Sequence, residues 1–281
     1  MIILKYITEV KKQINLWKKQ DLSIGLVPTM GYLHDGHKSL IDRAVKENDK
    51  VIVSIFINPS QFGPYEDFNK YPKNLQNDTE LCKNSCIDIL FIPEIQEMYP
   101  SESYTFVNVG KLTKGLCGAT RPVHFKGVCT VVAKLFNITN PTRAYFGEKD
   151  AQQLAVIKRM VSDLNFDIEI IGCPIIREKD GLAKSSRNTY LSKQERKAAL
   201  IINTSLENAK EALKIDVTNS EIIEKLIRDK IDKEPLAKVD YIEIVDSLTL
   251  TPIVKIQAST LVATAVYIGK TRLIDNFTWN R

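Results

Sequence analysis

Apolar runs typical of buried strands alternate with helix-like segments over the first two-thirds of this 281-residue chain. The runs are residues 24–27, 51–57, 87–92, 143–147 and 167–172, and segments with helical spacing of apolar residues separate them. Continuous apolar character is typical of parallel strands that are covered on both faces. The pattern therefore predicts right-handed βαβ units and a Rossmann-like, doubly wound α/β fold around an open, mostly parallel sheet.

The pattern changes near residue 175. From there on, helical segments are followed by strand-like segments without alternation; these are residues 192–213, 220–231, 239–246 and 260–269. Helices followed by strands predict a smaller α+β unit. We therefore expect a Rossmann-like ligand-binding domain at residues 1–175 and a smaller C-terminal domain at residues 176–281 that covers the site.

Composition and charge exclude several classes of protein. No apolar run approaches the roughly 18–20 residues needed to span a bilayer, and the N-terminus lacks the features of a signal peptide. We therefore expect a cytoplasmic protein without a membrane partner. The net charge of +5 is mild and the lysines are dispersed, so we expect no nucleic-acid partner. Five cysteines without a CxxC pair argue against a disulfide framework or a zinc site.

Polar segments rich in motif-like residues follow four of the predicted strands. They are residues 28–37, 57–74, 146–153 and 177–188. Ligands of open α/β sheets bind in the crevice outside the carboxyl ends of the strands. We therefore expect the four segments to contribute to one shared site.

The first of these segments, "PTMGYLHDGH", holds His34 and His37, which fall at or near the start of the next predicted helix. The N–H groups and dipole of a helix start favour phosphate, and two imidazoles there can donate hydrogen bonds to its oxygens. A metal site is an alternative, but it needs a third ligand, and His124 is the only other histidine. A polar helix cap without a ligand is the remaining alternative.

The other three segments supply amides, cations and hydroxyls suited to a nucleotide and a small acid. Amides can hold hydroxyls or a carboxylate, glycine permits close approach, and cations beside serines favour an oligophosphate. Judged alone, the second segment could be a plain loop and the third a capped helix start. The residues concerned are Asn58 and Gln61, then Gly147, Lys149, Asp150 and Gln153, and finally Lys184, Ser185, Ser186 and Arg187.

Five stretches resemble, in order, the motifs of the pantoate–β-alanine ligase (pantothenate synthetase) family. They are "PTMGYLHDGH", "INPSQFGPYEDFNKYP", "CGATRPVHFKGVCTVVAKLFN", "YFGEKDAQQL" and "REKDGLAKSSRNTYLS". The first contains an HxGH motif similar to that of nucleotidylyltransferases and class I aminoacyl-tRNA synthetases, and "KSSRN" stands where their second phosphate motif is expected. The similarity runs from about residue 20 to 195 and continues weakly to the end. Five long motifs in order are far more specific than one HxGH.

The resemblance implies an ATP-dependent ligase that condenses pantoate and β-alanine to pantothenate. The reaction passes through pantoyl adenylate and releases pyrophosphate and AMP. The resemblance also implies a homodimer and a Mg²⁺ ion held mainly by phosphate oxygens and water, with Asp78 as a candidate carboxylate for the metal.

Residue roles follow from the motif match. Catalytic roles are implied for His34, His37, Lys149, Ser185 and Arg187. A pocket for pantoate and β-alanine is implied for Pro28, Met30, Asn58, Gln61 and Gln153. Contacts with ATP are implied for Met30, His34, His37, Gly147, Lys149, Asp150, Ile176, Lys184, Ser185, Ser186 and Arg187. The chain departs from the family at Lys184, where an apolar residue is common, and at Ala151, where an aromatic one is common.

Three other functions stay open at this point. A nucleotidylyltransferase with another acceptor would use the same phosphate motifs but would not release AMP on addition of β-alanine. A non-catalytic nucleotide- or RNA-binding module would bind RNA with a steep salt dependence and without ATP turnover. A metallohydrolase would use His34, His37 and His124 as ligands.

Overall fold

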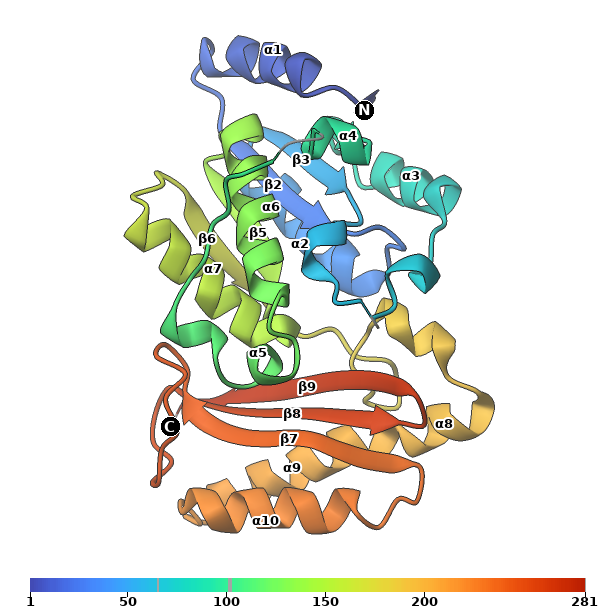
Figure 1. Ribbon diagram of the computed structural model, residues 1–281, viewed down its shortest axis with the longest axis vertical. Coiled ribbons are helices and arrows are strands. Elements are labelled where there is room, and N and C mark those ends of the chain that lie inside the picture. The colour runs from blue at the N-terminus through green and yellow to red at the C-terminus, as the bar shows by residue number, and fades with distance from the viewer. Residues whose placement is uncertain (65, 101–102, 281) are drawn as a thin grey trace.

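Two β-sheets, one above the other, organise the residues that the structure describes, which are 1–64, 66–100 and 103–280 (Figure 1). In this computed structural model the first sheet is parallel and six-stranded, with the order β1-β4-β3-β2-β5-β6. The second is antiparallel and three-stranded, with the order β7-β8-β9. The prediction of a Rossmann-like sheet followed by a smaller α+β unit is confirmed. A domain boundary at residue 175 stays a prediction.

The elements follow the predicted alternation. The strands are β1 (Ile2–Leu4), β2 (Ile24–Thr29), β3 (Lys50–Ile55), β4 (Ile89–Phe91), β5 (Arg143–Gly147), β6 (Glu169–Cys173), β7 (Ala237–Asp246), β8 (Thr260–Ile268) and β9 (Thr271–Trp279). The α-helices are α1 (Ile7–Lys18), α2 (Asp35–Glu47), α3 (Leu75–Asn84), α4 (Ile95–Met98), α5 (Cys117–Thr120), α6 (His124–Thr139), α7 (Ala151–Asp163), α8 (Lys193–Ala198), α9 (Leu200–Lys214) and α10 (Ser220–Ile231). The 3-10 turns are η1 (Pro59–Gln61), η2 (Phe68–Lys70), η3 (Lys111–Thr113), η4 (Glu148–Asp150) and η5 (Ser186–Tyr190). The strands β1 and β9 were not predicted.

Helices cover both faces of the parallel sheet, which explains the continuous apolar character of its strands. Side chains alternate between the faces, so Ile24 and Leu26 of β2 pack on the side of α1, α6 and α7. Val27 packs on the opposite side, against α2 and α3. The loops after the strands are thereby brought together at the carboxyl edge of a rigid sheet.

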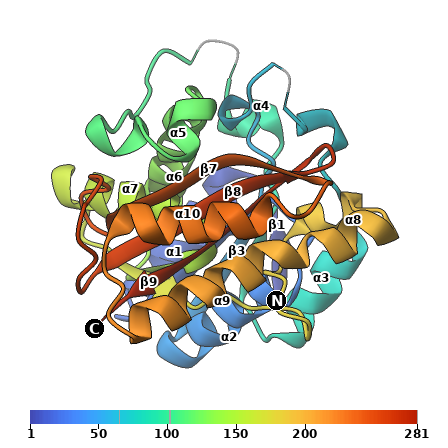
Figure 2. The same ribbon diagram turned by 90° about the horizontal axis from the view of Figure 1, so that it is seen from below.

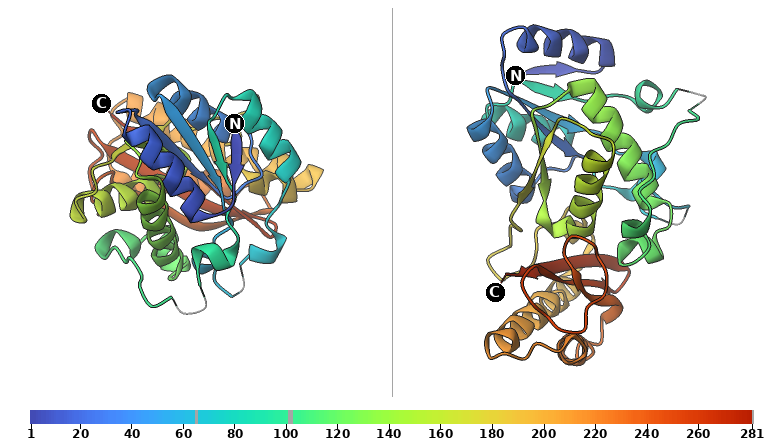
Figure 3. Two further views of the ribbon diagram at one scale, coloured as in Figure 1. Left: turned by 90° about the horizontal axis from the view of Figure 1, so that it is seen from above. Right: turned by 90° about the vertical axis from the view of Figure 1, so that its left-hand side faces the viewer.

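The antiparallel sheet lies across this carboxyl edge, and α9 and α10 cover its far face (Figure 2). We call β7–β9 with α8–α10 the C-terminal layer. Apolar residues of β8 and β9, such as Val262, Val266 and Leu273, pack against Ile202 and Ile227 of the helices. Figure 3 shows that α1 lies at the opposite end of the molecule from this layer. The near face of the antiparallel sheet is therefore turned toward the loops that carry the predicted motifs.

Two further features concern the chain as a whole. None of the helices in the described part of the chain has the length and apolar character needed to cross a bilayer. The five cysteines are all free thiols.

Candidate active site

The loops after β2, β3, β5 and β6 converge at the carboxyl edge of the parallel sheet, where they line two neighbouring cavities. The smaller cavity, of about 210 Å³, lies mainly against the parallel sheet. The larger, of about 1120 Å³, lies between this sheet and the C-terminal layer. The predicted site residues line the smaller cavity with two exceptions, Asn58 and Asp78. Residues that line both cavities are Lys149, Asp150, Gln153, Ser185 and Arg187.

The two histidines of the first motif are held at the start of α2. His34 is the N-cap residue, and its Nδ1 accepts a hydrogen bond from the Gly36 N–H at 3.1 Å. The His34 N–H in turn donates to Nδ1 of His37 at 3.3 Å, and the two ring centroids lie 4.1 Å apart. Because both Nδ1 atoms accept, each neutral ring carries its proton on Nε2. Each ring therefore keeps an Nε2–H donor for a ligand.

Both histidines are neutral near pH 7. Burial, and then the positive charge of Lys149, lower the pKa of His34 to about 4. Burial and the neighbouring His34 ring lower the pKa of His37 to about 3. Desolvation disfavours the charged form, and an added cation nearby disfavours it further. The pair thus offers polar donors without its own charge, beside the cation that Lys149 supplies.

The turn before the histidines is fixed by Asp78 of α3. Gly31 has a φ of +85°, which suits glycine, and the next two N–H groups point at one carboxylate. The Tyr32 N–H donates to Asp78 Oδ2 at 2.8 Å and the Leu33 N–H donates to Oδ1 at 2.7 Å. Burial raises the pKa of Asp78 above its ordinary value. Asp78 therefore positions the motif, and its predicted contact with a metal stays a prediction.

The described residues do not form a ready-made metal cage. No three His, Cys, Asp or Glu side chains among them are grouped to hold a metal ion. His124 lines the larger cavity, whereas His34 and His37 line the smaller one, and its Nδ1 pairs with the Gln61 carbonyl oxygen at 3.0 Å. Burial and Arg121 lower the pKa of His124 to about 4. The arrangement argues against a three-histidine metallohydrolase, and a Mg²⁺ ion held mainly by phosphate and water stays a prediction.

The amide pair of the second motif is buried against helix α6. Asn58 is only 1% exposed, and its Nδ2 donates to Gln61 Oε1 at 3.2 Å and to the Gly127 carbonyl at 3.1 Å. Its Oδ1 accepts from Ser60. Gln61 lines the smaller cavity, with its Nε2 2.9 Å from the sulfur of Met30. Asn58 therefore holds Gln61 in place, and its own contact with pantoate stays a prediction.

Close packing explains a glycine beside this amide pair. A Cβ atom at Gly127 would overlap the Ser60 carbonyl oxygen and lie 2.5 Å from the Gln61 backbone. At Gly147, by contrast, a Cβ atom would meet no described residue beyond its chain neighbours within 4 Å. The first glycine lets a helix touch the loop, whereas the second faces open space in the smaller cavity. Tyr65, which belongs to the second motif, lies outside the described residues.

Every predicted phosphate-binding cation has a carboxylate partner. The ion pairs are Lys149 Nζ to Asp150 Oδ2 at 3.4 Å, Lys184 Nζ to Asp35 Oδ2 at 2.9 Å, and Arg187 to both oxygens of Asp67 at 2.9 Å. Burial raises and Lys149 lowers the pKa of Asp150, with a net decrease. A triphosphate entering this cavity would therefore compete with carboxylates for the cations.

Sequence reasoning missed several residues that shape the site. Glu66 and Asp67 hold Arg121 and Arg187, although both acids lie inside the second motif. Gln152 is buried, with its Nε2 donating to the carbonyls of residues 112 and 115 and its Oε1 accepting from the Cys117 N–H. The sequence signal for Gln152 was its position next to Gln153, a predicted site residue. Ile176 and Ser186 line the smaller cavity, and their contacts with ATP stay predictions. Ala151, where the family commonly has an aromatic residue, lines the larger cavity.

The class of protein follows from fold and site together. An HxGH motif at a helix start and a Lys-Ser-Ser-Arg loop line one cavity at the carboxyl edge of a Rossmann-like sheet, an arrangement suited to a protein that binds a nucleotide by its phosphates. The family model for pantoate-beta-alanine ligase matches residues 2–278, and the chain belongs to this family.

Individual relatives agree over the whole length. The chain is 67% identical to the pantothenate synthetase of Clostridium acetobutylicum, with both chains covered completely. Among solved structures it resembles pantothenate synthetase from Thermus thermophilus, with 42% identity, complete coverage of both chains and a TM-score of 0.95. It also resembles pantoate-beta-alanine ligase from Francisella tularensis, complexed with beta-gamma ATP and beta-alanine. That comparison gives 38% identity, a TM-score of 0.80 and coverage of 99% and 97% of the two chains.

Proposed function

We propose that this chain joins pantoate to β-alanine in two ATP-dependent steps in the smaller cavity. First, a carboxylate oxygen of pantoate attacks the α-phosphorus of ATP, an O–P bond forms, and pyrophosphate leaves. The amine of β-alanine then attacks the acyl carbon, a C–N bond forms, the amine loses a proton, and AMP leaves. The observation that carries the proposal is the convergence of residues from four distant segments on one cavity, in a chain of this family.

The histidine pair is proposed to stabilise charge on the phosphates during adenylation. The Nε2–H groups of His34 and His37 are free of the Nδ1 contacts that fix the rings. Fixed donors aimed at developing negative charge lower a barrier without reorganising at the moment of reaction. The neutral state of both rings lets Lys149, rather than imidazolium, supply the formal positive charge.

The cations are proposed to exchange carboxylates for phosphates when ATP binds. Arg187 would leave Asp67 for the β- and γ-phosphates, while Ser185 and Ser186 donate their hydroxyls. Lys184, at the start of the same loop, would leave Asp35. A guanidinium exchanging one bidentate anion for another keeps its hydrogen bonds, so the exchange is limited by differences in desolvation. In this way the site keeps its cations neutralised before substrate binds.

Different residues of the smaller cavity would bind pantoate and the nucleoside part of ATP. Gln61 and Gln153, with Met30 and Pro28, would hold pantoate, since amides bind hydroxyls and carboxylate without fixing a protonation state. At the other end, Asp150 would accept from ribose hydroxyls and Gly147 would leave room for the sugar, with Ile176 against adenine. A bound Mg²⁺ would neutralise charge on the phosphate oxygens.

A product assay tests the proposal. Purified protein is given ATP, Mg²⁺, pantoate and β-alanine, each omitted in turn, and AMP and pantothenate are quantified. We expect equal amounts of both products only in the complete mixture. Pantoate-dependent pyrophosphate exchange without β-alanine-dependent AMP release would instead indicate a nucleotidylyltransferase with another acceptor. Absence of both would overturn the proposal.

Assembly and compartment are also proposals. We infer a homodimer from the family resemblance, and light scattering at micromolar concentration would test it. We infer a reducing compartment such as the cytoplasm, because the five cysteines are free thiols and the proposed substrate is ATP. Fractionation of cells that produce the chain would test this.

A further inference from the structure

The strand β9 lies at the edge of the antiparallel sheet and presents different residues to its two sides. Leu273 and Phe277 pack with the helices α9 and α10. Ile274, one residue on, packs against the core of the parallel sheet. Because side chains alternate along a strand, Asp275 shares the helix side and Asn276 shares the other side. Both are polar, and they are only 3% and 5% exposed.

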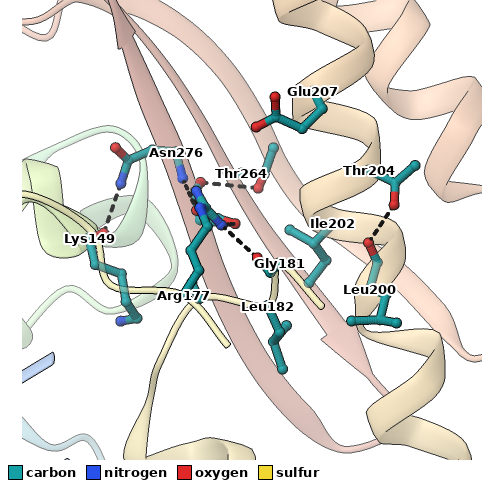
Figure 4. A network of polar contacts seen from close by, with 12 residues as sticks. Lys149, Arg177, Gly181, Leu182, Leu200, Ile202, Thr204, Glu207, Thr264 and Asn276 are labelled. Carbon is teal, nitrogen blue, oxygen red and sulfur yellow. Dashed lines mark hydrogen bonds and ion pairs between the residues drawn. The ribbon is translucent and has the colours of Figure 1, made fainter. Parts of the chain in front are cut away.

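Asn276 holds the backbone of the turn that carries Lys149. Its Nδ2 donates to the Glu148 carbonyl at 3.1 Å and to the Lys149 carbonyl at 2.8 Å. Figure 4 shows the Lys149 side chain extending away from Asn276. One amide group thus fixes the main chain of η4 from the C-terminal layer, while the Lys149 ammonium stays on the cavities.

Asp275 holds the loop that leads to the Lys-Ser-Ser-Arg motif. Its carboxylate accepts two hydrogen bonds from Arg177, at 2.6 and 2.9 Å, in a mostly buried ion pair. Arg177 also donates to the Gly181 carbonyl at 3.1 Å, which closes the loop (Figure 4). The loop is further closed by the Lys184 N–H, which donates to the Ile176 carbonyl at 2.9 Å. Asp275 is therefore joined through Arg177 to the residues on both sides of this loop.

We propose that Asp275 and Asn276 are positioning residues that set the spacing between the Lys149 turn and the 176–187 loop. This inference rests on the proposed function of those two segments as the walls of an ATP site. Neither residue needs to touch ATP, because each acts through a backbone or side-chain partner in one wall. The hydrogen bonds of two adjacent residues on one strand thereby connect segments that are about 30 residues apart in the sequence.

Asp275 and Asn276 would affect adenylation by positioning the Lys149 turn and the 176–187 loop. Misplacing a catalytic group by about 1 Å can cost about 10²-fold in rate. Loss of the Asn276 amide would leave two carbonyls without that donor and allow the η4 turn to shift. The effect should then depend on Lys149, since that ammonium is the group displaced. A purely structural role would weaken the protein whether or not Lys149 is present.

The test compares Asn276→Ala in two backgrounds by pantoate-dependent ATP–pyrophosphate exchange. In the wild-type background we expect about a tenfold loss in kcat/KM for ATP, with the KM for pantoate unchanged. In a Lys149→Ala background we expect less than a twofold further loss, because residues acting as a unit are not additive. Thr278→Ala, an exposed change on the same strand and face, is the matched control and should retain full activity.

The outcomes separate this inference from the proposed function. Equal fold-losses from Asn276→Ala in both backgrounds, or no loss at all, would overturn the positioning role. Normal exchange by Lys149→Ala alone would instead overturn the proposed role of Lys149. If Asn276→Ala does not fold, Asn276→Gln keeps the amide at a longer reach, and we expect a smaller loss with the same dependence on Lys149.

Asp275 provides an independent arm of the test. Asp275→Asn keeps the shape but removes the charge that pairs with Arg177, and we expect a rise of about fivefold in the KM for ATP. The same exchange assay should show an unchanged KM for pantoate. A change of equal size in both KM values would contradict a specific effect on the ATP wall.

Discussion

The histidine motif of the parallel sheet and the segments tied to the C-terminal layer are held in place in different ways. On the wall of the parallel sheet, His34 is fixed by Gly36 and His37, which lie within three residues of it along the chain. From the C-terminal layer, Asn276 holds the Lys149 turn across 127 residues of sequence. The parallel sheet carries the histidine pair in a local motif, whereas the placement of the Lys149 turn depends on long-range hydrogen bonds. The reactive histidines are thus set by a local motif, and their spacing from other site groups is set by contacts between residues distant in the sequence.

The largest effect is expected from removing groups of the reactive wall. His34→Ala or Lys149→Ala should reduce pantoate-dependent ATP–pyrophosphate exchange by about 10²-fold or more, the range for a lost electrostatic contact at a transition state. Lys38→Ala is the matched control, because Lys38 is an exposed α2 residue paired with Asp42. Near-normal exchange by both site variants would remove the phosphate role of this wall.

A smaller effect is expected where a helix meets the second motif. Gly127→Ala would place a Cβ atom in overlap with the Ser60 carbonyl oxygen, so the loop that carries Gln61 must move. Overpacking of this kind typically costs about 1–3 kcal/mol, and we expect about a tenfold rise in the KM for pantoate. Gly110→Ala is the control, since a Cβ there meets no described residue beyond its chain neighbours within 4 Å. An unchanged KM for pantoate would contradict the placement of Gln61.

Removing a competing carboxylate should have a modest effect of opposite sign. Asp67→Asn takes away the anion that holds Arg187 in the absence of ATP. We expect the KM for ATP to fall about two- to fivefold, because phosphate no longer displaces a carboxylate, while the free protein loses stability from an uncompensated guanidinium. Asp163→Asn, in an exposed pair with Arg159, should change neither quantity. A higher KM for ATP in Asp67→Asn would contradict the exchange of anions.

The smallest effect concerns pH. Burial holds the pKa of His34 at about 4 and that of His37 at about 3, below the ordinary 6.5. Above pH 6.5 both rings are neutral in the folded and in the unfolded protein. Below pH 6.5 the unfolded chain binds protons that the folded chain does not, so the free energy of unfolding falls toward pH 4. We expect the urea midpoint to decrease between pH 7 and pH 5, and to decrease less in His37→Gln. An equal decrease in both proteins would exclude the histidine contribution.

The sequence patterns predicted the parallel sheet, and the motifs pointed to residues that line the smaller cavity, because both depend on short-range signals. The run 24–27 and the spacing of His34 and His37 are readable without tertiary structure. Strand β9 was not predicted, since Asp275 and Asn276 interrupt its apolar pattern with buried polar groups whose partners lie far away. Strand β1 was missed because it has only three residues, too short a run to give a strand pattern.

The polar contacts of Arg187 and Asp78 could not be predicted, because their partners are also far away in the sequence. Arg187 meets Asp67 across 120 residues, and Asp78 meets the turn before His34 from another helix. Motif matching indicated that Arg187 and Asp78 belong to the site, but it could not show which groups they contact before ligands bind. Tertiary contacts alone supply that information.

Oxygen transfer tests the adenylation claim most directly. Pantoate labelled with ¹⁸O on both carboxylate oxygens is converted with ATP and β-alanine, and the products are analysed by mass spectrometry. If the carboxylate attacks the α-phosphorus, AMP gains one labelled oxygen and the new amide of pantothenate keeps the other. Unlabelled AMP, or label in phosphate or pyrophosphate, would contradict the account.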